Sequence, residues 1–186
     1  MPHINFNNDF PGIRSAMAYS PETAAPMGVL AEILLRSNDG LSRAERELIG
    51  TYVSYLNDCF YCNHSHGAIA CIYLDGDSGL VDQVRKDYSK AAISDKLKSL
   101  LAIAAKVQTG GKNVTAADVE LAKAKGATDK DVHDTVLIAA AFCMFNRYVD
   151  GLATIIPTDM NSYPLRAKQV VDSGYGNHVF TSKQPA

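Results

Sequence analysis

The sequence lacks several features that would assign it to a specialised class of protein. No apolar run approaches the ~20 residues that a membrane-spanning helix needs. Residues 1–10 contain no basic region followed by an apolar core, so we expect no signal peptide and a cytoplasmic protein. The net charge is only −2, and this balance favours neither nucleic acid nor an anionic membrane as a partner.

Cysteine is also scarce, with four residues in a chain of 186. That number is too small for a disulfide framework at this length. The acidic, glycine-containing segment 74–79 is too short for a calcium loop and lacks the glutamate that would follow it. We therefore expect no metal and no organic cofactor.

What the sequence does contain is helical periodicity over most of its length, which predicts an all-α, oligomer-forming helical bundle. The length suits one domain with a sizeable core. We predict a single domain over 1–186, with an N-terminal arm over about 1–20 and a C-terminal arm over about 158–186. Helices are expected over about 21–36, 42–56, 59–73, 80–88, 94–107, 116–125 and 128–156, with a further candidate over 163–171.

The residues with the most chemistry gather between positions 41 and 70. With Asp58 as the N-cap of a helix, Cys59 falls in its first turn, and Cys59 and Cys62 share one face. This spacing permits a disulfide. His66 lies one turn further along the same face. The free N–H groups and the positive dipole end of a first turn would stabilise a thiolate there.

A cysteine with a lowered thiol pKa is a nucleophile near neutral pH, and His66 could take or return its proton. Glu47 is expected to approach from the preceding helix, where its carboxylate could orient His66. The alternative is that Glu47 does not contact His66 and is a solvated or salt-bridged helix residue. Glu45 has a plainer role, because Ser42 and Glu45 form a capping-box pattern.

The residues alone leave other interpretations of the CxxC open. Together with His64 or His66 it could supply zinc ligands, although the chain has no second CxxC. It could also form a structural disulfide or be a coincidental pair on a core helix. A redox dithiol is favoured, because CxxC in an intracellular setting is typical of redox chemistry. Of the remaining candidates, Cys71 is expected to pack and His133 to be solvated. Asn146 either hydrogen-bonds across the core near the CxxC helix or caps a backbone carbonyl.

The spacing of Glu47, Cys59, Cys62 and His66 resembles the alkylhydroperoxidase D (AhpD) core of the carboxymuconolactone decarboxylase superfamily. The resemblance is closest to the peroxidase-related branch of that superfamily. It extends over most of the chain, through residues 11–27, 41–49 and 145–157. The resemblance implies an AhpD-like helical bundle that assembles as a trimer or hexamer.

The resemblance also implies roles for these residues. Cys62 would be the peroxidatic cysteine that becomes a sulfenic acid, Cys59 would resolve it as a disulfide, and Glu47 and His66 would form a proton relay. The best-known members carry a second relay histidine immediately before the second cysteine, where this chain has Tyr61. This departure implies a weaker peroxidase activity or a different substrate.

We therefore predict a thiol-dependent peroxidase that reduces small-molecule hydroperoxides through the CxxC pair. An external dithiol, such as a lipoyl group or a thioredoxin-like protein, would restore the thiols. One alternative is a carboxymuconolactone decarboxylase-like lyase, whose chemistry needs no thiol pair. Another is a non-catalytic, redox-sensing or zinc-binding helical oligomer.

Overall fold

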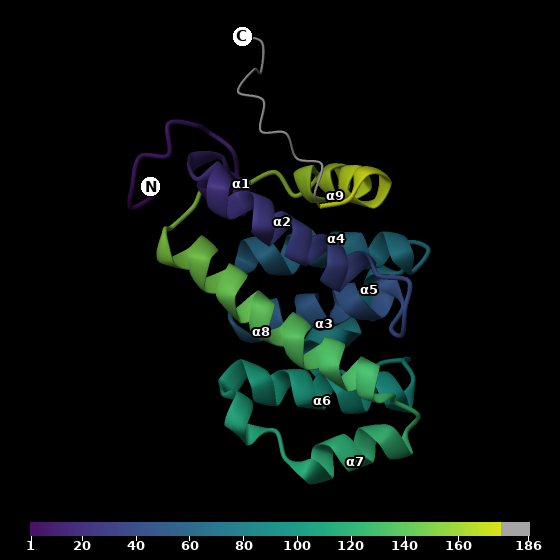
Figure 1. The fold of residues 1–186 in the computed structure, drawn as a ribbon. Helices are drawn as coiled ribbons and strands as arrows, with labels where there is room; N and C mark the ends of the chain where they lie inside the picture. The colour runs from purple at the N-terminus through teal and green to yellow at the C-terminus, as the bar shows by residue number, and fades with distance from the viewer. Residues whose placement is uncertain (176–186) are drawn as a thin grey trace.

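The computed structural model describes residues 1–175 and is 70% helical. Within these residues the chain forms nine α-helices and one short 3₁₀ helix and contains no β-strand, which confirms the predicted all-α fold (Figure 1). The helices are α1 (Ile13–Tyr19), α2 (Pro21–Arg36), α3 (Arg43–Leu56), α4 (Phe60–Tyr73), α5 (Ser78–Asp87), α6 (Asp95–Thr109), α7 (Ala116–Ala124), α8 (Asp129–Gly151) and α9 (Ser162–Ser173), with the 3₁₀ helix η1 at Gly111–Asn113.

Helix α3 lies at the centre of the bundle and packs against α2, α4, α5, α6 and α8 (Figure 1). All of its residues from 46 to 54 are buried, so this helix has no solvent-facing side over its middle turns. Its start is fixed by the predicted capping box, in which Ser42 and Glu45 exchange side-chain-to-backbone hydrogen bonds. A polar side chain on the middle turns of α3 is therefore enclosed by the neighbouring helices and shielded from solvent.

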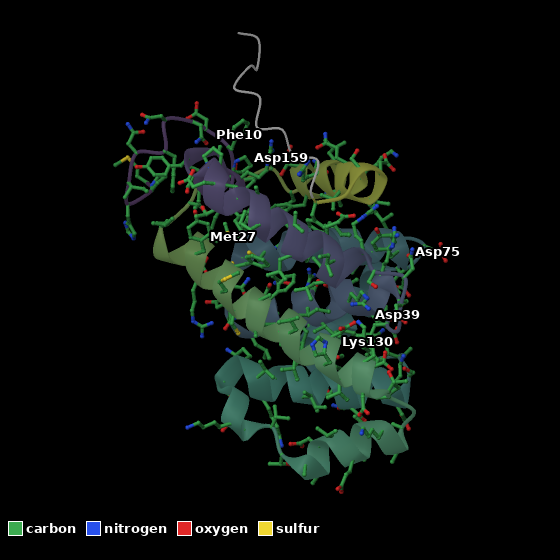
Figure 2. The ribbon with its side chains drawn as sticks, viewed as in Figure 1. Phe10, Met27, Asp39, Asp75, Lys130 and Asp159 are labelled. Carbon is green, nitrogen blue, oxygen red and sulfur yellow. The ribbon has the colours of Figure 1, made fainter. Side chains whose placement is uncertain are left out.

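Burial of α3 extends to Arg46, whose side chain is fully enclosed. Its guanidinium donates to three backbone carbonyls within residues 34–41, at 2.5 to 2.9 Å, and to Asp134 on α8 at 2.8 Å. Figure 2 shows Asp39, which supplies one of these carbonyls, and Lys130 near the N-terminal end of α8. Arg46 thus joins the end of α2 and the loop after it to the start of α8, with Asp134 as its ion-pair partner.

The connection from α3 to α4 differs from the prediction. Asp58 is not the N-cap, because its φ of 56° places it in the left-handed region rather than in the extended conformation of a capping residue. Cys59 is the N-cap, with φ −82° and ψ 95°, and α4 begins at Phe60. Consequently Cys62, rather than Cys59, lies in the first turn of the helix.

Helix α8 also ends earlier than expected, at Gly151 instead of near residue 156. The N–H of Thr154 donates to the carbonyl of Val149, and the N–H of Ala153 donates to that of Asp150. These two bonds form a Schellman motif with Ala153 at φ 48°. Glycine usually occupies the left-handed position of this motif, so the alanine at position 153 gave no indication in the sequence that the helix ends there.

The two arms pack against the core at one end of the molecule, where α1 and α9 lie (Figure 1). The N-terminal arm is joined to the segment after α8, since the N–H of Gly12 donates to the carbonyl of Ile155 at 2.8 Å. In the C-terminal arm α9 packs on α4, which confirms the helix expected over 163–171. Tyr175 then turns inward to the core, and the rest of the predicted arm, 176–186, lies outside the described residues.

Candidate active site

The two cysteines of the CxxC motif meet at the start of α4. Cys59 is fully buried and Cys62 is 4% exposed. They lie 3.3 Å apart as free thiols, and their side chains are hydrogen-bonded. A disulfide has an S–S length of about 2.05 Å, so only a small approach separates this arrangement from the bonded pair.

The surroundings of the pair favour a thiolate at Cys62. The hydrogen bond from Cys59 lowers the pKa of Cys62, and His66 and Asn146 lower it further, against the opposing effect of burial. The same hydrogen bond to Cys62, together with burial, raises the pKa of Cys59. Of the two cysteines, Cys62 is therefore the one that ionises more readily, and it also lies in the positive first turn of α4.

Beside Cys62 lies a network of the buried Glu47 and the partly buried His66 and Tyr175. The Nδ1 of His66 is 2.8 Å from Oε2 of Glu47, and the Tyr175 hydroxyl donates a hydrogen bond to Oε1 of Glu47 at 2.7 Å. Because Nδ1 donates to the carboxylate, Nε2 is left for proton exchange in the site. Burial lowers the pKa of His66, but the Glu47 carboxylate outweighs it and the pKa ends above its ordinary value.

Packing holds this network in place. The His66 ring lies edge-to-face on Phe142, with centroids 4.6 Å apart, and stacks against Tyr175 at 5.9 Å. Phe142 in turn fills the space over Gly50, where a Cβ would stand 2.3 Å from its ring. The imidazole is therefore held between α8 and the segment after α9, and its orientation depends on a glycine in α3.

Asn146 hydrogen-bonds across the core, as one of its two interpretations predicted. Its amide nitrogen donates to the hydroxyl of Ser54 at 3.0 Å, and its oxygen accepts from Asn57 at 2.8 Å. A further hydrogen bond to Cys62 lowers the pKa of that thiol. Asn146 thus connects the end of α3 with the reactive sulfur.

A cavity of about 100 Å³ reaches Cys62 and His66 from outside the core. Its walls are mostly apolar. Tyr61, which stands where the second relay histidine of the resembling proteins would be, forms part of this wall. Burial raises the pKa of Tyr61, so its hydroxyl keeps its proton, and its ring packs under Gly12 of the N-terminal arm. The tyrosine therefore shapes the cavity as a neutral side chain.

The structure brings Cys59, Cys62, His66 and Glu47 together in one place, as expected for a single site. His64 lies elsewhere, because its ring stacks on Phe60 and its Nδ1 faces the carbonyl of that residue.

Other candidates outside this group have structural roles. Cys71 is partly buried and packs against the main core, as predicted. His133 is exposed, as predicted, and its Nδ1 lies 3.0 Å from a carboxylate oxygen of Asp134. Sequence reasoning missed Tyr175 entirely, because the tail after α9 is polar and glycine-containing and carries no periodic pattern.

Two observations bear on other kinds of site. Within residues 1–175 no three His, Cys, Asp or Glu side chains converge in a way that could hold a metal ion. In the same part of the chain, no helix has both the length and the hydropathy required to cross a membrane.

The fold and the site together define an all-helical protein with a paired dithiol beside a histidine–carboxylate pair. The model of the carboxymuconolactone decarboxylase family matches residues 21–71 and 80–155. The chain therefore belongs to this family. None of the curated proteins matches it.

Two solved structures resemble the chain over most of its length. One is described as an uncharacterized peroxidase-related protein from Silicibacter sp. TM1040, with 29% identity and a TM-score of 0.74, over 83% of this chain and 78% of the other. The second is described as an alkylhydroperoxidase AhpD core, an uncharacterized peroxidase-related protein from Ralstonia eutropha JMP134. It has 31% identity and a TM-score of 0.74, over 81% of this chain and 78% of the other. The chain is thus similar to AhpD-like, peroxidase-related proteins.

Proposed function

We propose that the protein is a thiol-dependent peroxidase that reduces hydroperoxides through a Cys59–Cys62 dithiol and disulfide cycle. The observation that supports this most strongly is the hydrogen-bonded thiol pair, in which the pKa of Cys62 is lowered and that of Cys59 is raised. A single nucleophilic thiolate beside a neighbouring thiol is the arrangement that peroxide reduction and disulfide closure require.

In the first step the Cys62 thiolate attacks the terminal oxygen of the hydroperoxide. An S–O bond forms and the O–O bond breaks, so sulfur is oxidised to a sulfenic acid and the leaving group departs as an alkoxide. His66 supplies the proton that converts the alkoxide to an alcohol, and the adjacent Glu47 carboxylate stabilises its protonated form beforehand.

In the second step Cys59 attacks the sulfur of the Cys62 sulfenic acid. The S–S bond forms as the S–O bond breaks, and the hydroxide leaves as water with the proton released by Cys59. The 3.3 Å separation means that closure requires little backbone movement. An external dithiol, a lipoyl group or a thioredoxin-like protein, then reduces the disulfide by exchange.

The family includes decarboxylases by name, and a lyase of that kind would not need two thiols. The hydrogen-bonded thiol pair is therefore the feature that favours the peroxidase over the lyase. Alkylation of both thiols separates these two possibilities, since a peroxidase loses all activity and a lyase keeps it.

Peroxide consumption in the presence of dihydrolipoate tests the proposal. We expect the wild-type protein to consume tert-butyl hydroperoxide catalytically and Cys62→Ser to lose this activity, whereas Cys71→Ser, which changes the partly buried cysteine on the same helix, retains it. Equal consumption by wild type and Cys62→Ser would contradict the mechanism.

We further propose that the protein forms a homo-oligomer, a trimer or hexamer, in the cytoplasm. Exposed apolar side chains on α2 and α8, including Val29, Ile33 and Met144, support assembly. Light scattering after size-exclusion chromatography tests this, and a monomeric mass at micromolar concentration would contradict it.

A further inference from the structure

The cavity that reaches Cys62 has a basic end that the peroxidase mechanism does not use. Arg14 on α1 and Arg166 on α9 both line it, and of the described residues in its wall none is acidic. The rest of the wall is apolar and includes Ile13, Leu35 and Ile69. A ligand that fits these walls has an apolar body and one negatively charged group.

Two buried hydrogen-bonding atoms in the same wall have no partner among the described residues. They are the Nε of Arg14 and the hydroxyl oxygen of Tyr163, whose side chain is 4% exposed. Buried polar atoms are satisfied in the great majority of native structures, so each such orphan calls for an explanation. A bound acceptor, such as a carboxylate, would accept from both.

A ring contact positions Arg14, and the charge of Arg14 acts on Arg166. The guanidinium of Arg14 lies over the ring of Phe10, 4.8 Å from its centroid, which fixes the side chain without neutralising it. Figure 2 shows Phe10 in the segment that leads to α1. Burial lowers the pKa of Arg166 and the nearby charge of Arg14 lowers it further, so the two cations lie close enough to repel. An anion between them would relieve that repulsion.

These three side chains lie outside the part of the chain that carries the family match. The match covers 21–71 and 80–155, and so includes both reactive cysteines, whereas Arg14, Tyr163 and Arg166 belong to the two arms. Chemistry and recognition are therefore assigned to different segments of this chain.

We infer that the cavity selects hydroperoxides that carry a carboxylate, which Arg14, Arg166 and Tyr163 bind while the peroxide group reaches Cys62. That the substrate is a hydroperoxide rests on the proposed peroxidase function. That it carries a negative charge rests on the residues that line the cavity. Arginine binds a carboxylate through its planar fork of donors, and such charge-assisted bonds are the strong ones in a desolvated site. The small volume indicates a short aliphatic acid.

The test compares the tertiary hydroperoxide of isocaproate with that of isocaproamide, because the amide keeps the shape and removes the charge. We expect wild type to prefer the carboxylate by roughly tenfold or more in kcat/KM, and Arg166→Gln and Tyr163→Phe to reduce this preference. Arg147→Gln, which changes an exposed arginine on α8, should leave the preference as in wild type. Equal kcat/KM for acid and amide in wild type would overturn the inference.

A binding measurement separates this inference from the proposed function. Titration of the wild-type protein with isocaproate, followed by calorimetry, should show binding that Arg166→Gln weakens by roughly tenfold and that isocaproamide does not reproduce. Isocaproate binding without any peroxide consumption would contradict the peroxidase function and support the anion site. Consumption of both peroxides without isocaproate binding would support the peroxidase function and contradict the anion site.

Discussion

Replacement of Glu47 by glutamine isolates the charge of the carboxylate from its shape. The side chain is fully buried and contacts both His66 and Tyr175. A glutamine there can still accept from the Tyr175 hydroxyl and donate to a neutral His66, so the number of hydrogen bonds is preserved. What disappears is the negative charge that keeps the pKa of His66 above its ordinary value.

The consequence for activity should be much larger than the consequence for stability. A positioned acid or base contributes about 10²–10⁴-fold to a rate. We therefore expect Glu47→Gln to lower kcat/KM for hydroperoxide about 100-fold, which equals about 2.7 kcal/mol in the barrier. The free energy of unfolding should fall by only about 0.5–1.5 kcal/mol, because both hydrogen bonds remain and only change from charge-assisted to neutral.

A pH profile distinguishes this positioning role from a structural one. Without Glu47 the pKa of His66 falls, Cys62 loses the nearby positive charge that lowers its own pKa, and its alkylation by iodoacetamide should begin at higher pH than in wild type. The control is Glu45→Gln, the same change two residues earlier in α3, where the side chain only caps the helix and pairs with Lys96. A Glu47→Gln protein with the turnover and the alkylation profile of Glu45→Gln would refute the reasoning.

Three further predictions follow from other parts of the structure. Cys59→Ala removes the hydrogen bond that contributes most to the lowered pKa of Cys62, so the midpoint pH for alkylation of Cys62 by iodoacetamide should rise. Peptide mass spectrometry measures this midpoint, and an unchanged value would contradict the prediction. Gly50→Ala places a methyl group 2.3 Å from the Phe142 ring and should cost about 1–3 kcal/mol in urea unfolding and reduce turnover, whereas a neutral effect would mean that the ring can move. Arg46→Ala leaves buried acceptors unpaired and should cost about 3–5 kcal/mol, or about 6–20 °C in Tm by calorimetry; a loss below 1 °C would contradict its structural role.

Local signals in the sequence were sufficient for the parts of the fold that depend on neighbouring residues. The capping box of Ser42 and Glu45 forms as expected, because the two partners are three residues apart. The placement of His66 one turn after Cys62 follows from helix geometry in the same way. Cys59 approaches Cys62 from the N-cap position instead of from the predicted first turn. Glu47 needed the family resemblance in addition, since its partner lies on another helix.

Contacts between distant segments were not predictable from such signals. Tyr175 is 128 residues from Glu47 in the chain, and no pattern in the tail indicates that it turns into the core. Arg46 gives the appearance of a surface residue, because charged side chains are rarely buried and its carbonyl partners are fixed only by the path of the loop after α2. Arg14 and Arg166 meet at the cavity only because both arms close over the same end of the bundle.

The most direct test of the mechanism is the identity of the cysteine that a hydroperoxide oxidises first. In Cys59→Ser the sulfenic acid cannot be resolved by its neighbour, so a substoichiometric amount of tert-butyl hydroperoxide followed by dimedone should trap it. The account predicts a dimedone adduct on the peptide that contains Cys62, with Cys71 and Cys143 unmodified. An adduct on either of those cysteines in place of Cys62, or none on any cysteine while peroxide is consumed, would contradict it.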